Sequence, residues 1–164
     1  MNSKLVLESL DLNNLQDLAN RLVQCLPPRL TIGLVGTLGA GKTTLVQAIS
    51  SAMGVDRAEV TSPTFTLLQS HRGGGQTLHH LDAYRVADED EFLELGVEEL
   101  FEQEQAWTLI EWADRVEGVM PKNVLWLELL IDSQPDRRTV EITTADHVLS
   151  QALETALREM ISKG

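Results

Sequence analysis

One stretch of the sequence combines glycines with a lysine and a threonine in a spacing that suits phosphate binding. Residues 36–43 read Gly-Thr-Leu-Gly-Ala-Gly-Lys-Thr and match the whole G-x-x-x-x-G-K-[ST] pattern. The glycines let the backbone curl so that several N–H groups point at phosphate oxygens, and a helix that begins at the lysine adds its positive dipole end. Lys42 would contact the β- and γ-phosphates, while the Thr43 hydroxyl would be a ligand of Mg²⁺. The sequence therefore predicts a nucleotide site.

The predicted site takes in the whole phosphate loop and the residue after it: Gly36, Thr37, Leu38, Gly39, Ala40, Gly41, Lys42, Thr43 and Thr44. A glycine-rich turn that binds nothing is a poor alternative, because an apolar run enters the loop and a helical pattern leaves it. The sequence contains no Asn-Lys-x-Asp signature that would read a guanine base. ATP is therefore favoured over GTP.

A phosphate loop usually works with a carboxylate at the end of a neighbouring strand, close to the Mg²⁺. Asp82 ends one predicted strand, and Glu111 directly follows another that is more apolar. Either residue could ligate the metal directly or through water, or orient the attacking water. The alternatives without a function are a turn residue at Asp82 and a helix cap or salt-bridge partner at Glu111. The residues alone leave the choice of metal ligand open.

A short polar segment follows the helix that leaves the phosphate loop. It can carry a switch that senses the γ-phosphate, and an ordinary turn before a strand explains it equally well. Its residues are Ser62, Pro63 and Thr64. The adjacent His79 and His80 could suggest a metal site, but neighbouring side chains on a strand point to opposite faces. No zinc site is predicted from them.

The elements that would position these residues alternate between strands and helices. Predicted strands cover Lys4–Leu7, Leu30–Val35, Phe65–Ser70, Thr77–Asp82, Trp107–Ile110, Val124–Ile131 and Arg138–Thr143. Predicted helices cover Leu12–Cys25, Lys42–Met53, Glu89–Phe101 with a break at Gly96, Trp112–Val116 and Val148–Ile161. This alternation is typical of an α/β protein. We expect a single P-loop NTPase-like domain over residues 1–164, with a mostly parallel central sheet and flanking helices.

Size and composition narrow the class of protein. The chain has 164 residues, of which 43% are hydrophobic and 23% charged, and these values fit one folded domain and argue against disorder. No apolar run approaches the roughly 20 residues of a membrane helix, and no secretory signal is visible. The single cysteine, Cys25, cannot form an internal disulfide. We therefore expect a cytoplasmic protein that is monomeric when free and has no membrane partner.

The net charge of −12 is concentrated in one part of the chain. Residues 82–117 contain 13 acidic and two basic residues. Such a surface repels phosphate backbones, so strong direct binding of nucleic acid is not expected. Any role in nucleic-acid biology would depend on a partner protein.

Five motifs occur together in this sequence: GTLGAGKTT at 36–44, SPTF at 62–65, HLDAYR at 80–85, Leu95-Gly96, and IEW at 110–112. Together they resemble the TsaE (YjeE) family, small bacterial P-loop ATPases needed to form threonylcarbamoyladenosine in tRNA. The resemblance implies an ATPase that acts with Mg²⁺ on the TsaD–TsaB pair. In that pair TsaD transfers the threonylcarbamoyl group, and the TsaE protein hydrolyses ATP to reset the assembly between cycles.

The resemblance also implies roles for single residues. Thr43 and Glu111 would hold Mg²⁺, and Asp82 would lie beside them at the catalytic centre with Lys42. The segment 62–64 would be a switch-like loop, and Trp112 would lie close to the nucleotide. Asn14 is the nearest counterpart of an N-terminal segment that helps to hold adenine. Thr37 departs from the family, which commonly has aspartate there, so any role of that carboxylate is missing.

Two other functions compete with an ATPase that acts on a partner. A small-metabolite kinase would also pair a phosphate loop with an α/β domain, but it usually brings an arginine-rich lid, and here Arg85 and Arg115 are isolated in an acidic stretch. A nucleotide-gated interaction module would use ATP to order a loop without requiring hydrolysis. Because no arginine is evidently placed as an internal finger, the ATPase should be slow on its own.

Overall fold

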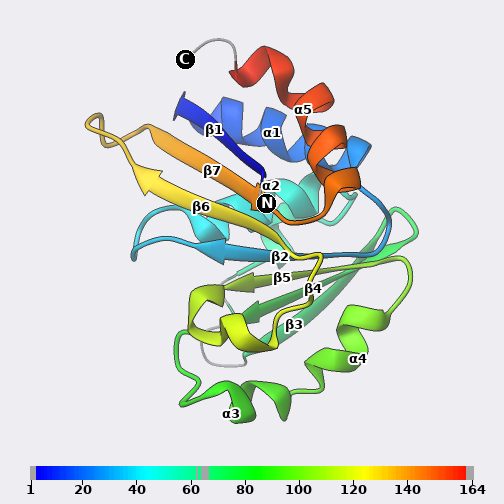
Figure 1. Ribbon diagram of the computed structural model, residues 1–164. Helices are drawn as coiled ribbons and strands as arrows, with labels where there is room; N and C mark the ends of the chain where they lie inside the picture. The colour runs from blue at the N-terminus through cyan, green and yellow to red at the C-terminus, as the bar shows by residue number, and fades with distance from the viewer. Residues whose placement is uncertain (1–2, 62, 64–66, 162–164) are drawn as a thin grey trace.

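A twisted sheet forms the middle layer of the molecule (Figure 1). The structure is a computed structural model that describes residues 3–61, 63 and 67–161. Within these residues seven strands pair in the order β1-β7-β6-β2-β5-β4-β3. Their bounds are Ser3–Leu10 (β1), Leu30–Val35 (β2), Leu68–Gly73 (β3), Gln76–Asp82 (β4), Ala106–Glu111 (β5), Leu125–Ile131 (β6) and Arg138–Thr144 (β7).

The centre of the sheet is parallel and its two edges are antiparallel. Strands β6, β2, β5 and β4 run in the same direction, whereas β7 and β1 on one side and β3 on the other run against their neighbours. The predicted α/β class with a mostly parallel central sheet is confirmed. Because β2, β4 and β5 are parallel, their carboxyl ends meet at one edge of the sheet, where ligands commonly bind.

Helices cover both faces of the sheet (Figure 1). Their bounds are Leu12–Cys25 (α1), Lys42–Ala52 (α2), Glu89–Leu93 (α3), Val97–Glu102 (α4) and His147–Ile161 (α5), with 3-10 turns at Arg57–Glu59 (η1) and Ala113–Val119 (η2). Helices α1, α2 and α5 bury their apolar sides in one large core, and α3, α4 and η2 enclose a smaller core on the other face. No helix within the described ranges has the length and apolar character needed to cross a bilayer.

Local signals set several of these boundaries as predicted. Helix α1 begins after Asp11, whose side chain accepts from the Asn14 N–H at 2.8 Å while the Asn14 side chain accepts from the Asp11 N–H at 3.0 Å. This reciprocal capping box satisfies two backbone donors that a helix start leaves unpaired. Gly96 has a φ of +79° and separates α3 from α4, so the predicted break in the acidic helix is confirmed.

Strand β3 differs from its prediction. It was expected at Phe65–Ser70, but the structure places it at Leu68–Gly73, and residues 65 and 66 lie outside the described residues. The turn that follows β3 consists of Gly74 and Gly75, both with positive φ. Strand β4 then pairs with β3 on one side and with β5 on the other. An exposed edge strand carries a weak apolar pattern, which explains the shifted boundary.

Candidate functional site

The predicted phosphate loop connects the carboxyl end of β2 to the first residue of α2. Two glycines in it cannot be replaced without distortion. A Cβ at Gly36 would lie 2.8 Å from the Leu129 carbonyl oxygen, and Gly41 has a φ of +105°, which side chains rarely allow. The loop therefore packs closely against β6, where the absence of a side chain at Gly36 makes room for the Leu129 carbonyl.

Lys42 lies folded against the phosphate loop. Its side chain is 5% exposed, and its Nζ donates to the carbonyl oxygens of Gly36 at 2.6 Å and Thr37 at 3.0 Å. The ammonium also lies 4.0 Å from the centroid of the Trp112 ring, a cation–π distance. Burial lowers the pKa of Lys42, and the nearby Glu111 carboxylate acts in the opposite direction.

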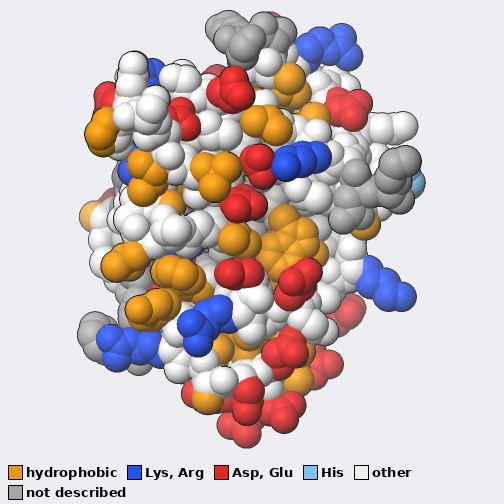
Figure 2. Space-filling model, turned by 60° about the vertical axis from the view of Figure 1, so that its left-hand side comes forward, with side chains coloured by type: hydrophobic (Ala, Val, Ile, Leu, Met, Phe, Trp, Pro, Cys, Tyr) orange, Lys and Arg blue, Asp and Glu red, His pale blue; other side chains and the backbone are white. Residues whose placement is uncertain are grey.

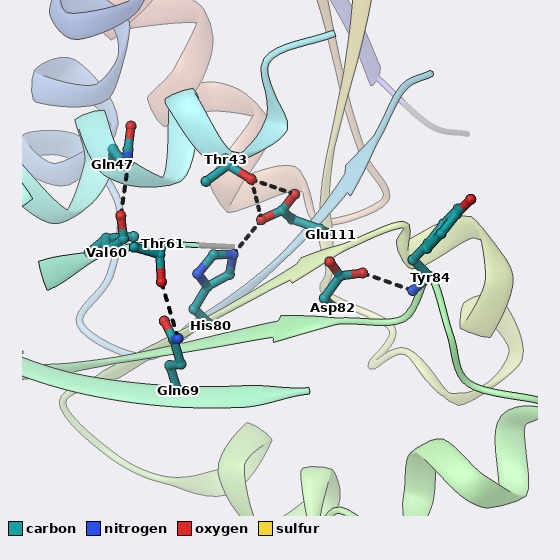
Figure 3. A network of polar contacts seen from close by, with 9 residues as sticks. All are labelled: Thr43, Gln47, Val60, Thr61, Gln69, His80, Asp82, Tyr84 and Glu111. Atoms are coloured by element: carbon teal, nitrogen blue, oxygen red, sulfur yellow. Dashed lines mark hydrogen bonds and ion pairs between the residues drawn. The ribbon is translucent and has the colours of Figure 1, made fainter. Parts of the chain in front are cut away.

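The two candidate carboxylates stand side by side at the ends of β4 and β5, where Asp82 and Glu111 are register partners. Figure 3 shows that their contacts differ. The Thr43 hydroxyl is 3.0 Å and 2.9 Å from the two carboxylate oxygens of Glu111. One oxygen of Asp82 accepts instead from the backbone N–H of Tyr84 at 2.8 Å. Glu111 is thus the carboxylate that contacts the predicted metal-binding hydroxyl.

His80 is a site residue that the sequence analysis missed. Its ring is fully buried, and its Nε2 donates to Glu111 Oε2 at 2.5 Å (Figure 3). His79 points to the other face, where it bonds to Ser70 and Gln103. The alternation of a strand that separated the two histidines also puts His80 on the same face as the residue two positions later, Asp82. That signal was available in the sequence.

Trp112 and Tyr84 border the site. Trp112 directly follows β5 in a left-handed backbone conformation, with a φ of +58°, an uncommon conformation for a bulky residue. The rings of Trp112 and Tyr84 lie 4.9 Å apart between centroids, and Tyr84 is 43% exposed. Trp112 therefore lies against Lys42, and its predicted proximity to the nucleotide stays a prediction.

An open cavity of about 390 Å³ brings most of the predicted residues together. It is lined by Leu38, Gly39, Gly41, Lys42, Thr43, Thr44, Asp82, Tyr84, Glu111 and Trp112. Gly36 and Thr37 line a neighbouring cavity that also reaches Trp112, and Ala40 is buried in the large core. The lining gives cationic, hydroxyl and carboxylate groups on adjoining walls, as a site for a phosphate chain and its cation requires.

Other predicted site residues are not brought to this cavity. Asn14 is held in the capping box of α1 and lines a different cavity with Glu8 and Arg21, and its predicted contact with adenine stays a prediction. Ser62 and Thr64 lie outside the described residues, whereas Pro63 is described and buried.

The donor set fits a hard cation that is shared with phosphate. Thr43 and Glu111 offer oxygen ligands, and Asp82 lies beside them. Among the described residues no group of three or more histidine, cysteine, aspartate or glutamate side chains could hold a metal ion by itself. Mg²⁺ in phosphate sites takes only one or two protein ligands and completes its shell with water and phosphate oxygens. The residues therefore suit Mg²⁺ together with a nucleotide.

Comparison with known families shows which family the chain belongs to. The sequence model of the family described as "Threonylcarbamoyl adenosine biosynthesis protein TsaE" matches residues 9–140. The chain belongs to the TsaE family. The resemblance seen in the sequence is thereby confirmed, and membership ties the chain to the biosynthesis of threonylcarbamoyladenosine.

Individual TsaE relatives agree with this assignment. The chain is 35% identical over 109 residues to the tRNA threonylcarbamoyladenosine biosynthesis protein TsaE of Haemophilus influenzae, a match that covers 66% of each chain, just under two thirds of that relative. It is 32% identical over 144 residues to the TsaE protein of Rickettsia bellii, covering 87% of this chain and 96% of the relative. The crystal structure of Bacillus subtilis YdiB superposes with a TM-score of 0.77 at 24% identity over 97% of both chains, which shows a shared fold.

Proposed function

We propose that this TsaE-family chain binds and hydrolyses ATP with Mg²⁺ and acts on the TsaD–TsaB transferase assembly that modifies tRNA. The threonylcarbamoyl group would be transferred by that assembly and not by this chain. The observation that carries the proposal is the single cavity in which Lys42 of a phosphate loop faces the Thr43–Glu111 pair and Asp82. The family assignment directs that chemistry to threonylcarbamoyladenosine formation.

The Thr43–Glu111 contact prepares a place for the cation. Glu111 is 3% exposed, and as a carboxylate it can only accept hydrogen bonds. The Thr43 hydroxyl therefore donates a hydrogen bond to Glu111, and the oxygen lone pairs of Thr43 remain available to a metal. The hydrogen bond from His80 Nε2 to Glu111 Oε2 fixes the orientation of the carboxylate. When bound, Mg²⁺ would neutralise charge that develops on the β- and γ-phosphate oxygens.

Asp82 would orient the attacking water in this proposal. It is 2% exposed, ends β4 next to Glu111, and is fixed in part by the Tyr84 N–H. A carboxylate so held can accept a hydrogen bond from a water molecule and align its attack on the γ-phosphate. Glu111 would thus lie beside the metal ion, and Asp82 would lie beside the attacking water.

Lys42 has to exchange partners when a nucleotide enters. Its ammonium now donates to two carbonyl oxygens of its own loop. Phosphate oxygens are stronger acceptors because they carry charge. Binding would therefore turn the ammonium toward the cavity, and the low exposure of Lys42 would strengthen its attraction to phosphate.

Few cations in the cavity explain why turnover should be slow without a partner. Lys42 is the only lysine or arginine that lines it among the described residues. Phosphoryl-transfer enzymes commonly add an arginine that stabilises the transferring group. A partner that supplies such a group, or reshapes the site, would accelerate hydrolysis. The same lack of arginine weighs against a metabolite kinase with an arginine-rich lid.

Calorimetry and phosphate release test the proposal directly. The wild type should bind MgATP and release phosphate slowly, and faster when purified TsaD and TsaB are added. Lys42→Ala should weaken ATP binding by about tenfold to a hundredfold, the effect of losing a charged hydrogen bond of about 1.5–3 kcal/mol. Lys122→Ala, at an exposed lysine, is the matched control and should behave as the wild type.

Two results would contradict the proposal. Absence of any MgATP binding by the wild type would remove the nucleotide site. Binding without phosphate release, with and without TsaD and TsaB, would favour a nucleotide-gated module that needs no hydrolysis.

A further inference from the structure

Arg138, the first residue of β7, reaches the outer side of the phosphate loop. Its Nε donates to the Ala40 carbonyl oxygen at 2.7 Å, and its Nη2 donates to the Gly39 carbonyl oxygen at 3.2 Å. Its Nη1 donates to the carbonyl oxygens of Pro135 at 2.7 Å and Arg137 at 2.9 Å. The planar guanidinium is therefore fixed on both sides, and it joins the loop to a strand almost 100 residues away in the sequence.

We propose that Arg138 is a positioning residue that holds the phosphate loop in the shape that binds a nucleotide; the inference rests on the proposed function. A peptide unit is planar and trans, so its C=O and N–H point in opposite directions. The Ala40 carbonyl turns toward Arg138. The Gly41 N–H, on the other side of the same peptide, must then turn away from Arg138.

The loop needs such an external restraint because of its own composition. Gly39 and Gly41 have φ values of +81° and +105°, and a glycine loses more conformational freedom on ordering than any other residue. Gly39 has nothing within 4 Å of the place where a Cβ would stand. Hydrogen bonds to two consecutive carbonyls order this part of the loop before a ligand arrives, which reduces the entropy lost on binding.

The guanidinium also places a positive charge behind the loop without entering the cavity. The lining of the cavity does not include Arg138. Its effect on a nucleotide therefore passes through the loop backbone and through the electrostatic potential. Charge alone could be supplied by lysine, but a lysine ammonium cannot reproduce the planar fork that bridges two carbonyls. Arginine and lysine at this position should therefore give different nucleotide affinities.

Arg137 offers a control for charge at the neighbouring position. It contacts the Ser9 carbonyl at 3.4 Å and Asp11 at 3.5 Å, both remote from the loop in the sequence. Arg137→Ala removes the same charge as Arg138→Ala and leaves the bonds of the Arg138 side chain to the loop in place. Arg138→Lys separates the loss of the fork from the loss of charge.

Binding of MgADP and MgATP is measured by calorimetry for the wild type and the three variants. We expect Arg138→Ala to weaken both nucleotides about tenfold, equivalent to about 1.4 kcal/mol. Arg138→Lys should lie between Arg138→Ala and the wild type, and Arg137→Ala should stay within about twofold of the wild type. In nucleotide-free protein, hydrogen exchange of the amides of residues 39–42 should be faster in the Arg138 variants only.

The inference is overturned if Arg138→Ala binds both nucleotides as tightly as Arg137→Ala and its loop amides exchange no faster. Equal affinity of Arg138→Lys and the wild type would also overturn it, because charge alone would then suffice. If Arg138→Ala does not fold, Arg138→Lys and Arg137→Ala carry the same comparison. A wild type that binds neither nucleotide would refute the proposed function and this inference with it.

Discussion

Glu111 and Asp82 are neighbours in the sheet, but different groups hold them. Glu111 is bonded to Thr43 and His80, whereas Asp82 accepts from the backbone of Tyr84. The first arrangement suits a residue that accompanies a metal ion, and the second suits one that aligns water. The sequence left this choice open because both residues end a strand; in the structure the contacts of Glu111 with Thr43 and His80 set it apart.

The two amide variants separate these roles. Glu111→Gln should bind ATP as the wild type does in EDTA. Adding Mg²⁺ should raise its ATP affinity about tenfold less than it raises that of the wild type, because an amide offers one neutral acceptor. Asp82→Asn should retain the gain in affinity from Mg²⁺ and release phosphate about a hundredfold or more slowly, because the carboxylate that aligns the attacking water is lost. Calorimetry with and without Mg²⁺ and a phosphate assay measure both effects, each variant serving as control for the other. The opposite pattern would exchange the roles of the two carboxylates.

At the scale of elements, local sequence signals predicted some boundaries and missed others. Helix α1 has the predicted ends because Asp11 caps its start and the pair Pro27 and Pro28 follows its end. Strand β2 has the predicted ends because it is one continuous apolar run. Strand β3 was shifted because an edge strand is specified by its pairing with β4. The bonds from Arg138 to the loop have no local signal at all, since they join segments that meet only in the folded chain.

Edge strand β3 also carries a histidine that should make stability depend on pH. The His71 side chain is 11% exposed, and its Nε2 has no hydrogen-bond partner within the described part of the chain. Burial lowers the pKa of His71, the nearby His80 lowers it further, and Glu59 acts in the opposite direction. The unfolded chain therefore takes up a proton at a higher pH than the folded chain does.

The sign of the effect follows from this difference in pKa. As the pH falls below about 6.5, the ordinary histidine pKa, the unfolded state gains protons first and the free energy of unfolding decreases. The decrease ends below the pKa of folded His71. His71→Gln should flatten the pH dependence between about pH 5 and pH 6.5 in urea unfolding, whereas His147→Gln, at an exposed histidine, should keep the wild-type slope. An unchanged slope in His71→Gln would contradict this account.

At the scale of the whole molecule, the acidic residues gather on one end. Figure 2 shows red side chains concentrated at the bottom of the view, the end that carries α3 and α4 in Figure 1. Not all of them are available for docking: Glu91 accepts from the Ala87 N–H at 2.9 Å, and Asp88 caps α3. Glu94, Glu98 and Glu99 are exposed. These three carboxylates form a negative surface that could attract a basic face of a partner.

Charge reversal tests whether this end steers the proposed encounter with the TsaD–TsaB pair. Glu94→Lys combined with Glu99→Lys should slow association about tenfold at low salt, because complementary charge acts mainly on the association rate. Added salt should reduce the difference, since exposed charges are screened within about 8–10 Å. Glu8→Lys combined with Glu154→Lys changes the net charge equally at exposed positions on β1 and α5 and should slow association less. If the two pairs of substitutions slow association equally, net charge, and not the α3–α4 end, governs the encounter. If neither pair changes the association rate, electrostatic attraction does not govern it.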